Sequence, residues 1–303
     1  MWLRQILRRL QMPSWIELLN HINSPLDKLR QEYLNKLHEK TGRNVVTYYS
    51  AWLQKDPSLR GLAISDADMN YFMSVFHKID KSKGLDLILH TPGGDIPATE
   101  AIVSYIHKLF GHDVRCIVPQ LAMSAGTMIA CGCKEIIMGK QSSIGPFDPQ
   151  LNGVPAYGVI EEFKQAAEEI KIAPEKVQLW QMIISKYHPS FIVECQNAIS
   201  MSSEIVKKWL KEIMFEGEKD ASKKAESIVK KLNNHNDTKA HARHIDIDSA
   251  IDMGLKIKSL EEDDELQDIV LTLHHSYIEL FNQTKVCKIV ENQDFVGMCI
   301  RHP

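Results

Sequence analysis

Apolar runs that predict strands alternate with amphipathic stretches that predict helices through the first half of the chain. Side chains that are β-branched, aliphatic or aromatic dominate the runs 44–49, 85–89, 114–118 and 135–138. Apolar residues recur at helical spacing over 14–42, 66–81, 97–110 and 124–132. Because parallel strands are joined by crossover helices, this alternation predicts an α/β fold with a mainly parallel sheet.

Capping and breaking residues predict where two of these helices begin and end. Ser24-Pro25 restarts the first helix and Gly42 ends it, whereas Ser65 is a suitable N-cap for the helix over 66–81.

The second half of the chain is predominantly helical in its pattern. The predicted helices are 155–170, 174–186, 189–213 and 266–279, and a strand follows at 288–290. The intervening stretch from Glu216 to Lys239 is highly charged, so we interpret 217–231 as a solvated helix and 233–237 as an exposed loop.

Neither an internal repeat nor a clear linker divides the chain. We therefore predict one core with elaborations: an N-terminal helical extension (1–42), a core (43–260) and a C-terminal helical and strand extension (261–303).

The composition is that of a folded globular protein. Hydrophobic residues make up 44% and charged residues 25% of the 303 residues, and the formal net charge is −3, which gives no reason to expect a nucleic-acid partner. No run of 18 or more apolar residues suggests a transmembrane span. Residues 1–12 form a basic amphipathic segment without the features of a signal peptide, so we expect a cytoplasmic protein. This segment fits packing on the protein as well as peripheral contact with a membrane.

The six cysteines contain no CxxC pair, and we expect them to be reduced and buried. Cys131-Gly132-Cys133 has no second cluster and no histidine at ligand spacing, so packing is a better interpretation than metal binding.

Two short motifs suggest nucleophilic chemistry. His90-Thr-Pro-Gly-Gly-Asp95 and Ala122-Met-Ser-Ala-Gly126 each follow a predicted strand. The glycines of the first permit a sharp turn with an exposed backbone amide, and the second places Ser124 where a helix begins. We therefore predict Ser124 as nucleophile and the backbone amides of Gly94 and Ala125 as an oxyanion hole.

These motifs, followed by Ser143-Ile-Gly-Pro-Phe-Asp-Pro-Gln150 and more loosely by His241-Ala-Arg-His-Ile245 and Ala250–Leu255, resemble the serine dehydrogenase proteinase family. That family lies within the Clp/crotonase superfamily, which also contains signal peptide peptidase A and the Clp peptidase. The resemblance implies a Clp/crotonase-like fold, peptidase activity on a peptide or protein substrate, and a homo-oligomer. Despite the word dehydrogenase, no GxGxxG fingerprint follows a strand, so we predict no NAD and no other cofactor or metal.

The resemblance also guides the choice of general base. Clp-type peptidases have a histidine some two dozen residues after the serine, and this chain has none in that region. Relatives of the signal peptide peptidase type use a lysine on a later helix, a position that corresponds here to Lys164. Lys176, Lys186 and His188 are the alternative bases, and Lys164 equally fits a solvent-facing ion pair with Glu161 or Glu168.

Other histidines and carboxylates remain open as further candidates. His90, His241 and His244 could serve as a base, and Asp95 and Asp148 could orient one or act in capping and turns.

The sequence thus predicts a serine peptidase with a Ser124–Lys164 dyad. An acyl-CoA-processing crotonase-type enzyme and an inactive oligomeric scaffold of the same fold are the alternatives.

Overall fold

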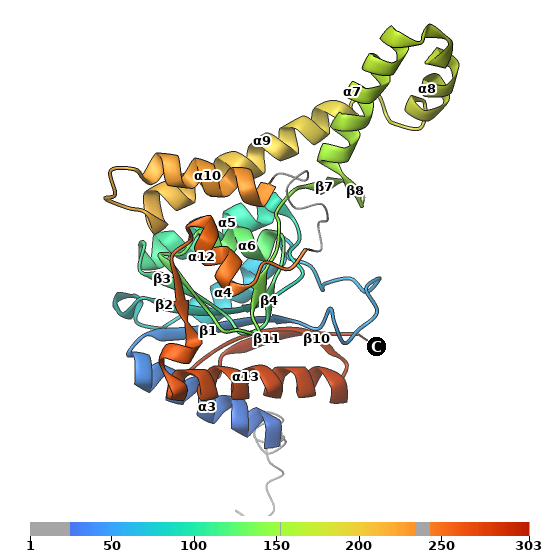
Figure 1. The fold of residues 1–303 in the computed structure, drawn as a ribbon. Helices are drawn as coiled ribbons and strands as arrows, with labels where there is room; N and C mark the ends of the chain where they lie inside the picture. The colour runs from blue at the N-terminus through green and yellow to red at the C-terminus, as the bar shows by residue number, and fades with distance from the viewer. Residues whose placement is uncertain (1–24, 152, 234–242, 303) are drawn as a thin grey trace, which may run out of the picture.

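The computed structural model describes residues 25–151, 153–233 and 243–302 and is organised around a central sheet (Figure 1). In the described residues this sheet has seven strands in the order β11-β10-β1-β2-β3-β5-β9. Their bounds are β1 Asn44–Ser50, β2 Leu85–His90, β3 Val114–Val118, β5 Glu135–Met138, β9 Ile257–Ser259, β10 Val286–Asn292 and β11 Gly297–Arg301. β1, β2, β3, β5 and β9 run parallel, whereas β10 and β11 are antiparallel to their neighbours. The predicted α/β fold with a mainly parallel sheet is confirmed.

Helices cover both faces of the sheet (Figure 1). Their bounds are α3 Pro25–Thr41, α4 Asp68–Phe76, α5 Ile96–Phe110, α6 Ala125–Cys131, α7 Ala156–Ile172, α8 Val177–Ile184, α9 Phe191–Trp209, α10 Ala221–Asn233, α12 Ile247–Met253 and α13 Asp264–Gln283. α3 and α13 bury one face, and α4, α5, α6, α9, α10 and α12 bury the other. Successive side chains of a strand point to opposite faces of the sheet and so pack in different cores. In β5, Ile136 and Met138 pack on one face and Ile137 packs on the other.

Short strand pairings lie beside the main sheet, toward the carboxyl ends of its parallel strands. β4 (Leu121–Ala122) pairs with β6 (Ser143–Ile144), and β7 (Gln150–Leu151) pairs with β8 (Val154–Pro155). An isolated bridge joins Thr91 to Ala122. These pairings bring the two sequence motifs next to each other.

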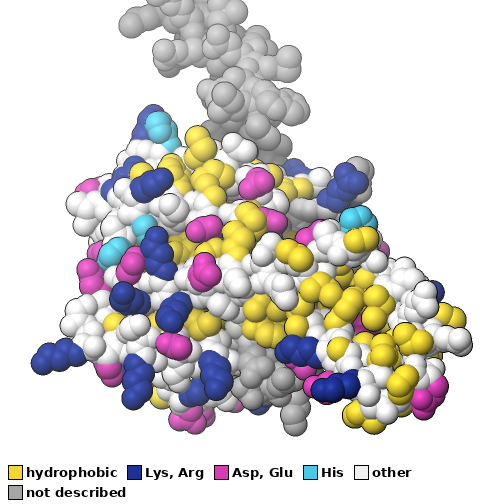
Figure 2. Space-filling model, turned by 90° about the horizontal axis from the view of Figure 1, so that it is seen from above, with side chains coloured by type: hydrophobic (Ala, Val, Ile, Leu, Met, Phe, Trp, Pro, Cys, Tyr) yellow, Lys and Arg dark blue, Asp and Glu magenta, His cyan; other side chains and the backbone are white. Residues whose placement is uncertain are grey.

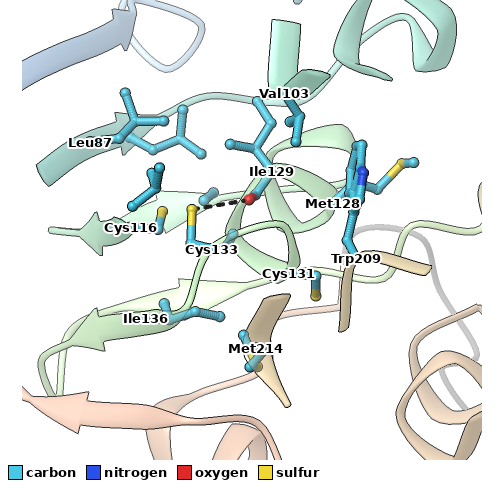
Figure 3. Packing of buried hydrophobic residues seen from close by; sticks show 14 of the residues in the cluster. Leu87, Val103, Cys116, Met128, Ile129, Cys131, Cys133, Ile136, Trp209 and Met214 are labelled. Atoms are coloured by element: carbon cyan, nitrogen blue, oxygen red, sulfur yellow. Dashed lines mark hydrogen bonds between the residues drawn. The ribbon is translucent and has the colours of Figure 1, made fainter. Parts of the chain in front are cut away.

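Helix α6 is anchored by complete burial (Figure 3). All seven of its residues are buried, and Cys131 and Cys133 lie among Ile129, Ile136 and Met214. The Cys133 thiol donates a hydrogen bond to the Ile129 carbonyl at 3.4 Å. The environment of Cys131 and Cys133 is therefore that of packed core residues. Burial raises the pKa of the Cys131 thiol, and a hydrogen bond with Cys116, together with burial, raises the pKa of the Cys133 thiol.

Several local expectations were wrong. The helix predicted over 66–81 is confined to Asp68–Phe76, because the backbone becomes extended at His77 and takes a positive φ of 70° at Lys78. Ser65 is not its cap, since the helix has no side-chain cap. Cys299 is exposed, because it lies on the edge strand β11, which the pattern did not predict.

The charged stretch after Glu216 is also only partly solvated. Helix α10 buries one apolar stripe, formed by Ala225, Ile228 and Leu232, against the core, and its lysines lie on the opposite side. An amphipathic helix with few apolar residues is easily mistaken for a solvated one when only its charge is considered.

α7, α8 and the beginning of α9 project from the body of the protein as an arm (Figure 1). Large apolar side chains are exposed on this arm, among them Ile172, Val177, Leu179, Met182 and Val193. Seen from above, hydrophobic side chains gather on the side to which the arm extends (Figure 2). The homo-oligomer stays a prediction, because a single chain is described.

None of the described helices combines the length and the hydrophobicity needed to cross a membrane. The amphipathic segment 1–12 lies outside the described residues.

A buried carboxylate near the beginning of β2 has two cationic partners. Asp86 is fully buried and accepts hydrogen bonds from Arg43 Nε at 2.7 Å and from Arg115 Nη2 at 2.6 Å. Asp86→Ala is expected to lower the free energy of unfolding by about 3–5 kcal/mol, since it removes the buried carboxylate that the two guanidinium groups share and leaves them only the more exposed partners Asp113 and Glu135. Urea unfolding measures this change.

The control is the exposed ion pair between Glu32 and Lys36 on α3. Glu32→Ala should change the free energy of unfolding by less than about 1 kcal/mol. Equal losses in the two variants would contradict the importance assigned to Asp86.

Candidate active site

Ser124 occupies a sharp turn between β4 and α6. Its backbone takes φ 52° and ψ −118°, a conformation that residues with a side chain rarely adopt. It stands at the N-cap of α6, yet its hydroxyl makes no capping hydrogen bond. Such strain concentrates at functional sites and costs on the order of 1–3 kcal/mol, which the surrounding packing must supply. The Ser124 hydroxyl therefore does not cap the helix, and Ser124 lines the cavity described below.

The first motif forms a turn, residues 91–95, which we call the glycine turn. The Gly93 carbonyl accepts a hydrogen bond from the Ile64 amide at 2.8 Å, and the Asp95 amide donates to the Ile64 carbonyl at 3.0 Å. A Cβ added to Gly94 would lie 2.3 Å from the Ile64 carbonyl oxygen and 2.4 Å from its nitrogen. Only glycine therefore permits the turn to pair so closely with Ile64.

The glycine turn also touches the start of α6. Gly93 has a φ of 97°, and a Cβ there would lie 2.7 Å from Ser124 Cβ and 2.8 Å from the Ala125 nitrogen. Gly126 of α6 also contacts this turn. A Cβ added there would lie 2.5 Å from the methyl carbon of Thr91, so the absence of a side chain at Gly126 leaves room for this methyl group. The sequence predicted a sharp turn at Gly93 and Gly94, but it did not predict the close contact of Gly93 with Ser124 and Ala125.

The backbone amides of Gly94 and Ala125, which the sequence predicts to form an oxyanion hole, lack a protein acceptor among the described residues. Within the described part of the chain, the amides of Gly94 and Ala125 donate no hydrogen bond, whereas the neighbouring Gly93 and Gly126 amides bond Thr91 Oγ1 and the Met123 carbonyl. Donors left unpaired at the first turn of a helix and at a glycine turn suit a developing negative charge.

A cavity of about 660 Å³ opens over Ser124 and the glycine turn. Apolar side chains form much of its wall, with Ile96, Met128, Phe147 and Met201 among them, and Glu194 and Asn197 of α9 add polar groups. It lies beyond the carboxyl ends of β2 and β3, where ligands of parallel α/β sheets commonly bind. Its size and its mainly apolar lining with a few polar groups are typical of a ligand-binding pocket.

The predicted bases do not line this cavity. Lys164 lies on α7 with a side chain that is 63% exposed, and its ammonium pairs with Glu161 at 2.8 Å. Lys176 pairs with Glu169 at 3.1 Å, Lys186 is exposed, and His188 Nδ1 lies 3.0 Å from Ser190 Oγ. All four belong to the arm, so the described chain brings Ser124, Gly94 and Ala125 together without any of these bases.

The titratable groups that do line the cavity are carboxylates. Asp95 caps α5, because its Oδ1 accepts a hydrogen bond from the Ala98 amide at 2.7 Å. Glu194 lies on α9 at the cavity wall. The described lining contains neither lysine nor histidine.

The remaining histidines lie elsewhere. His90 ends β2 but is fully buried on the other side of the sheet, where it contacts the rings of Tyr49, Trp52 and His274. His244 is exposed, and His241 lies outside the described residues.

The chain is similar to known proteins. A family model described as a ClpP-like SDH-type serine proteinase matches residues 16–288, nearly the whole chain. Two uncharacterized proteins of Methanocaldococcus jannaschii are also similar. MJ0137 is 33% identical over 144 residues, 46% of this chain and 49% of the relative. MJ1495 is 32% identical over 177 residues, 58% of this chain and 52% of the relative. The chain thus spans about half the length of the curated relatives it matches.

The buried His90 makes stability dependent on pH. Burial, and secondarily the nearby His274, lowers the pKa of His90 from 6.5 to about 3. The unfolded chain therefore binds more protons than the folded one in this interval, so the free energy of unfolding should fall as the pH drops below about 6.5. His90→Phe is expected to flatten this dependence when urea unfolding is measured between pH 7 and pH 4.5.

His77→Gln, which removes an exposed imidazole, is the matched control. If the two substitutions flatten the pH dependence equally, the assignment to His90 is wrong.

Proposed function

The chain belongs to the family of ClpP-like SDH-type serine proteinases, and on that premise we propose that it hydrolyses peptide bonds through an acyl-enzyme on Ser124. The observation that carries this proposal is the junction of the strained, uncapped Ser124 with two backbone amides that lack a protein acceptor. A packing role for a small residue would not require either the positive φ of Ser124 or the paired glycines of the turn.

In the proposed first step, Ser124 Oγ attacks the carbonyl carbon of the scissile peptide, and a base takes the hydroxyl proton. The carbonyl oxygen becomes an oxyanion that accepts hydrogen bonds from the Gly94 and Ala125 amides. The C–N bond then breaks, the amine leaves with a proton from the protonated base, and an ester remains on Ser124. Attack by water on this ester, with its proton passing to the base, releases the acid and restores the hydroxyl.

Lys164 remains the proposed base on the resemblance alone. Its ammonium is exposed and paired with Glu161, whereas a lysine needs burial or cationic neighbours to accept a proton near neutral pH. For Lys164 to act, the arm must bring it to a less solvated position beside Ser124. The test below treats it separately from the nucleophile.

A fluorophosphonate reagent tests the nucleophile, because an activated serine displaces its fluoride and forms a stable phosphonate ester. We expect modification of Ser124, identified by peptide mass spectrometry, and its loss in Ser124→Ala. Ser142→Ala, which alters a buried serine bonded to the Val118 carbonyl, is the control. An unmodified Ser124 in folded wild-type protein would overturn the hydrolase proposal and favour an acyl-CoA binder or a scaffold.

The same reagent tests the base when Lys164→Ala is compared with Lys171→Ala on the same helix. A dyad predicts slower modification in the first variant alone. Equal rates in both would remove Lys164 from the mechanism.

The oxyanion hole is tested by Gly94→Ala. Its Cβ would collide with the Ile64 backbone, so the turn must shift and the Gly94 amide with it. We expect the modification rate of Ser124 to fall by about 10²–10³, the usual effect of losing one such donor. Gly111→Ala is the control, since it alters a glycine of positive φ with open space around it at the end of α5. A rate within twofold of the wild type, about 0.4 kcal/mol in barrier, would contradict the role of Gly94.

A further inference from the structure

Lys288 carries an ammonium group into the interior of the protein. It lies on β10, and its side chain is 1% exposed. Its three N–H groups have three oxygen neighbours: Asp68 Oδ1 at 2.8 Å, Asp68 Oδ2 at 2.9 Å and the Ala63 carbonyl at 2.8 Å. An ammonium group has three donors and no acceptor, so this set satisfies its bonding capacity. Burial lowers the pKa of Lys288, and the charge of Asp68 opposes that effect.

Asp68 joins this ammonium to the segment before α4. The carboxylate is fully buried and also accepts hydrogen bonds from the Tyr48 hydroxyl at 2.8 Å and the Ser65 amide at 3.0 Å. The ion pair therefore holds the Ala63 carbonyl through Lys288 and the Ser65 amide through Asp68.

Ile64, the residue between these two anchors, holds the glycine turn. Its amide donates to the Gly93 carbonyl and its carbonyl accepts from the Asp95 amide. The Ala63 carbonyl and the Ser65 amide thus bond the ion pair, whereas the amide and the carbonyl of Ile64 both bond the turn. The segment 63–65 thus connects the buried ion pair directly to the backbone on both sides of Gly94.

We propose that Lys288 and Asp68 are positioning residues for the oxyanion hole, acting through Ala63, Ile64 and Ser65 on the Gly94 amide. This proposal rests on the proposed function. Ala63 itself lines the cavity with Ser124, which makes the connection short. Donors to an oxyanion must be held within a fraction of an ångström, and a displacement of about 1 Å can reduce the rate by about 10².

The test separates positioning from stability by comparing Lys288→Met, Asp68→Asn and the double variant. Lys288→Met leaves the Asp68 carboxylate buried without its ammonium, so both the melting temperature and the reactivity should fall. In the double variant both charges are gone and the melting temperature should recover, but the Ala63 carbonyl still lacks its donor. Asp68→Asn alone retains a lysine nitrogen that can donate to that carbonyl, whatever its charge.

The readouts are the melting temperature and the two constants of fluorophosphonate modification of Ser124, the maximal rate and the half-saturating concentration. We expect Lys288→Met and the double variant to lose about 10–100-fold in the maximal rate, with the half-saturating concentration within twofold of the wild type. Asp68→Asn should modify faster than the double variant, although it is the less stable of the two. If Lys288→Met fails to fold, Asp68→Asn and the double variant still test the positioning role, because the proposal predicts opposite rankings for their stability and their modification rate.

Arg30→Met is the matched control, because Arg30 is a buried cation that donates to Glu291 of β10 at 2.8 Å from the other face of the sheet. It should lose stability and keep the maximal rate. A maximal rate that follows the melting temperature through all variants would overturn the positioning role while leaving Ser124 as nucleophile. Wild-type protein without an adduct on Ser124 would overturn the proposed function first, and this inference with it.

Discussion

The contact of the glycine turn with the first turn of α6 is the constraint on which the candidate site depends. Gly93 lies against Ser124 and the Ala125 amide so closely that a Cβ would come within 2.8 Å of each. The same turn is fixed on its other side by Ile64. Because these partners are main-chain atoms and one Cβ, none can move aside as the end of a flexible side chain would. The spacing between the hydroxyl and the two amides is therefore set by packed main chain, which reorganises little when charge develops.

This arrangement needs a rigid support, and the sheet supplies it. The strain at Ser124 is held by a helix whose residues are all buried, and the glycine turn continues the fully buried strand β2. The antiparallel strand β10 adds a further support, since Lys288 reaches from it to the segment that pairs with the turn. Strands on both sides of β2 thus support the candidate site at its carboxyl end, although they are far apart in the sequence.

Much of this architecture could be predicted from the sequence because it rests on local patterns. Strands β1, β2, β3 and β5 and helices α5 and α6 have strong apolar patterns and clear glycine signals. The interior role of Lys288 could not be predicted, because its partner Asp68 lies 220 residues away and only the register of β10 on β1 brings them together. Charge alone was also misleading for α10, whose few apolar residues form a single buried stripe. Lys164 shows the same limit: helical spacing located it on α7 but could not determine where the arm points.

A buried ion pair is a costly way to stabilise a fold, since apolar residues of similar volume often serve as well or better. Lys288 and Asp68 have a capability that apolar side chains lack. They bind one carbonyl and one amide of an irregular segment and so fix its direction, whereas apolar contacts resist displacement but do not specify which way a peptide group points. Ile64 can pair with both Gly93 and Asp95 only if its own peptide groups face the turn. Because Lys288 and Asp68 fix the direction of the Ile64 backbone, this ion pair has a structural role beyond stability.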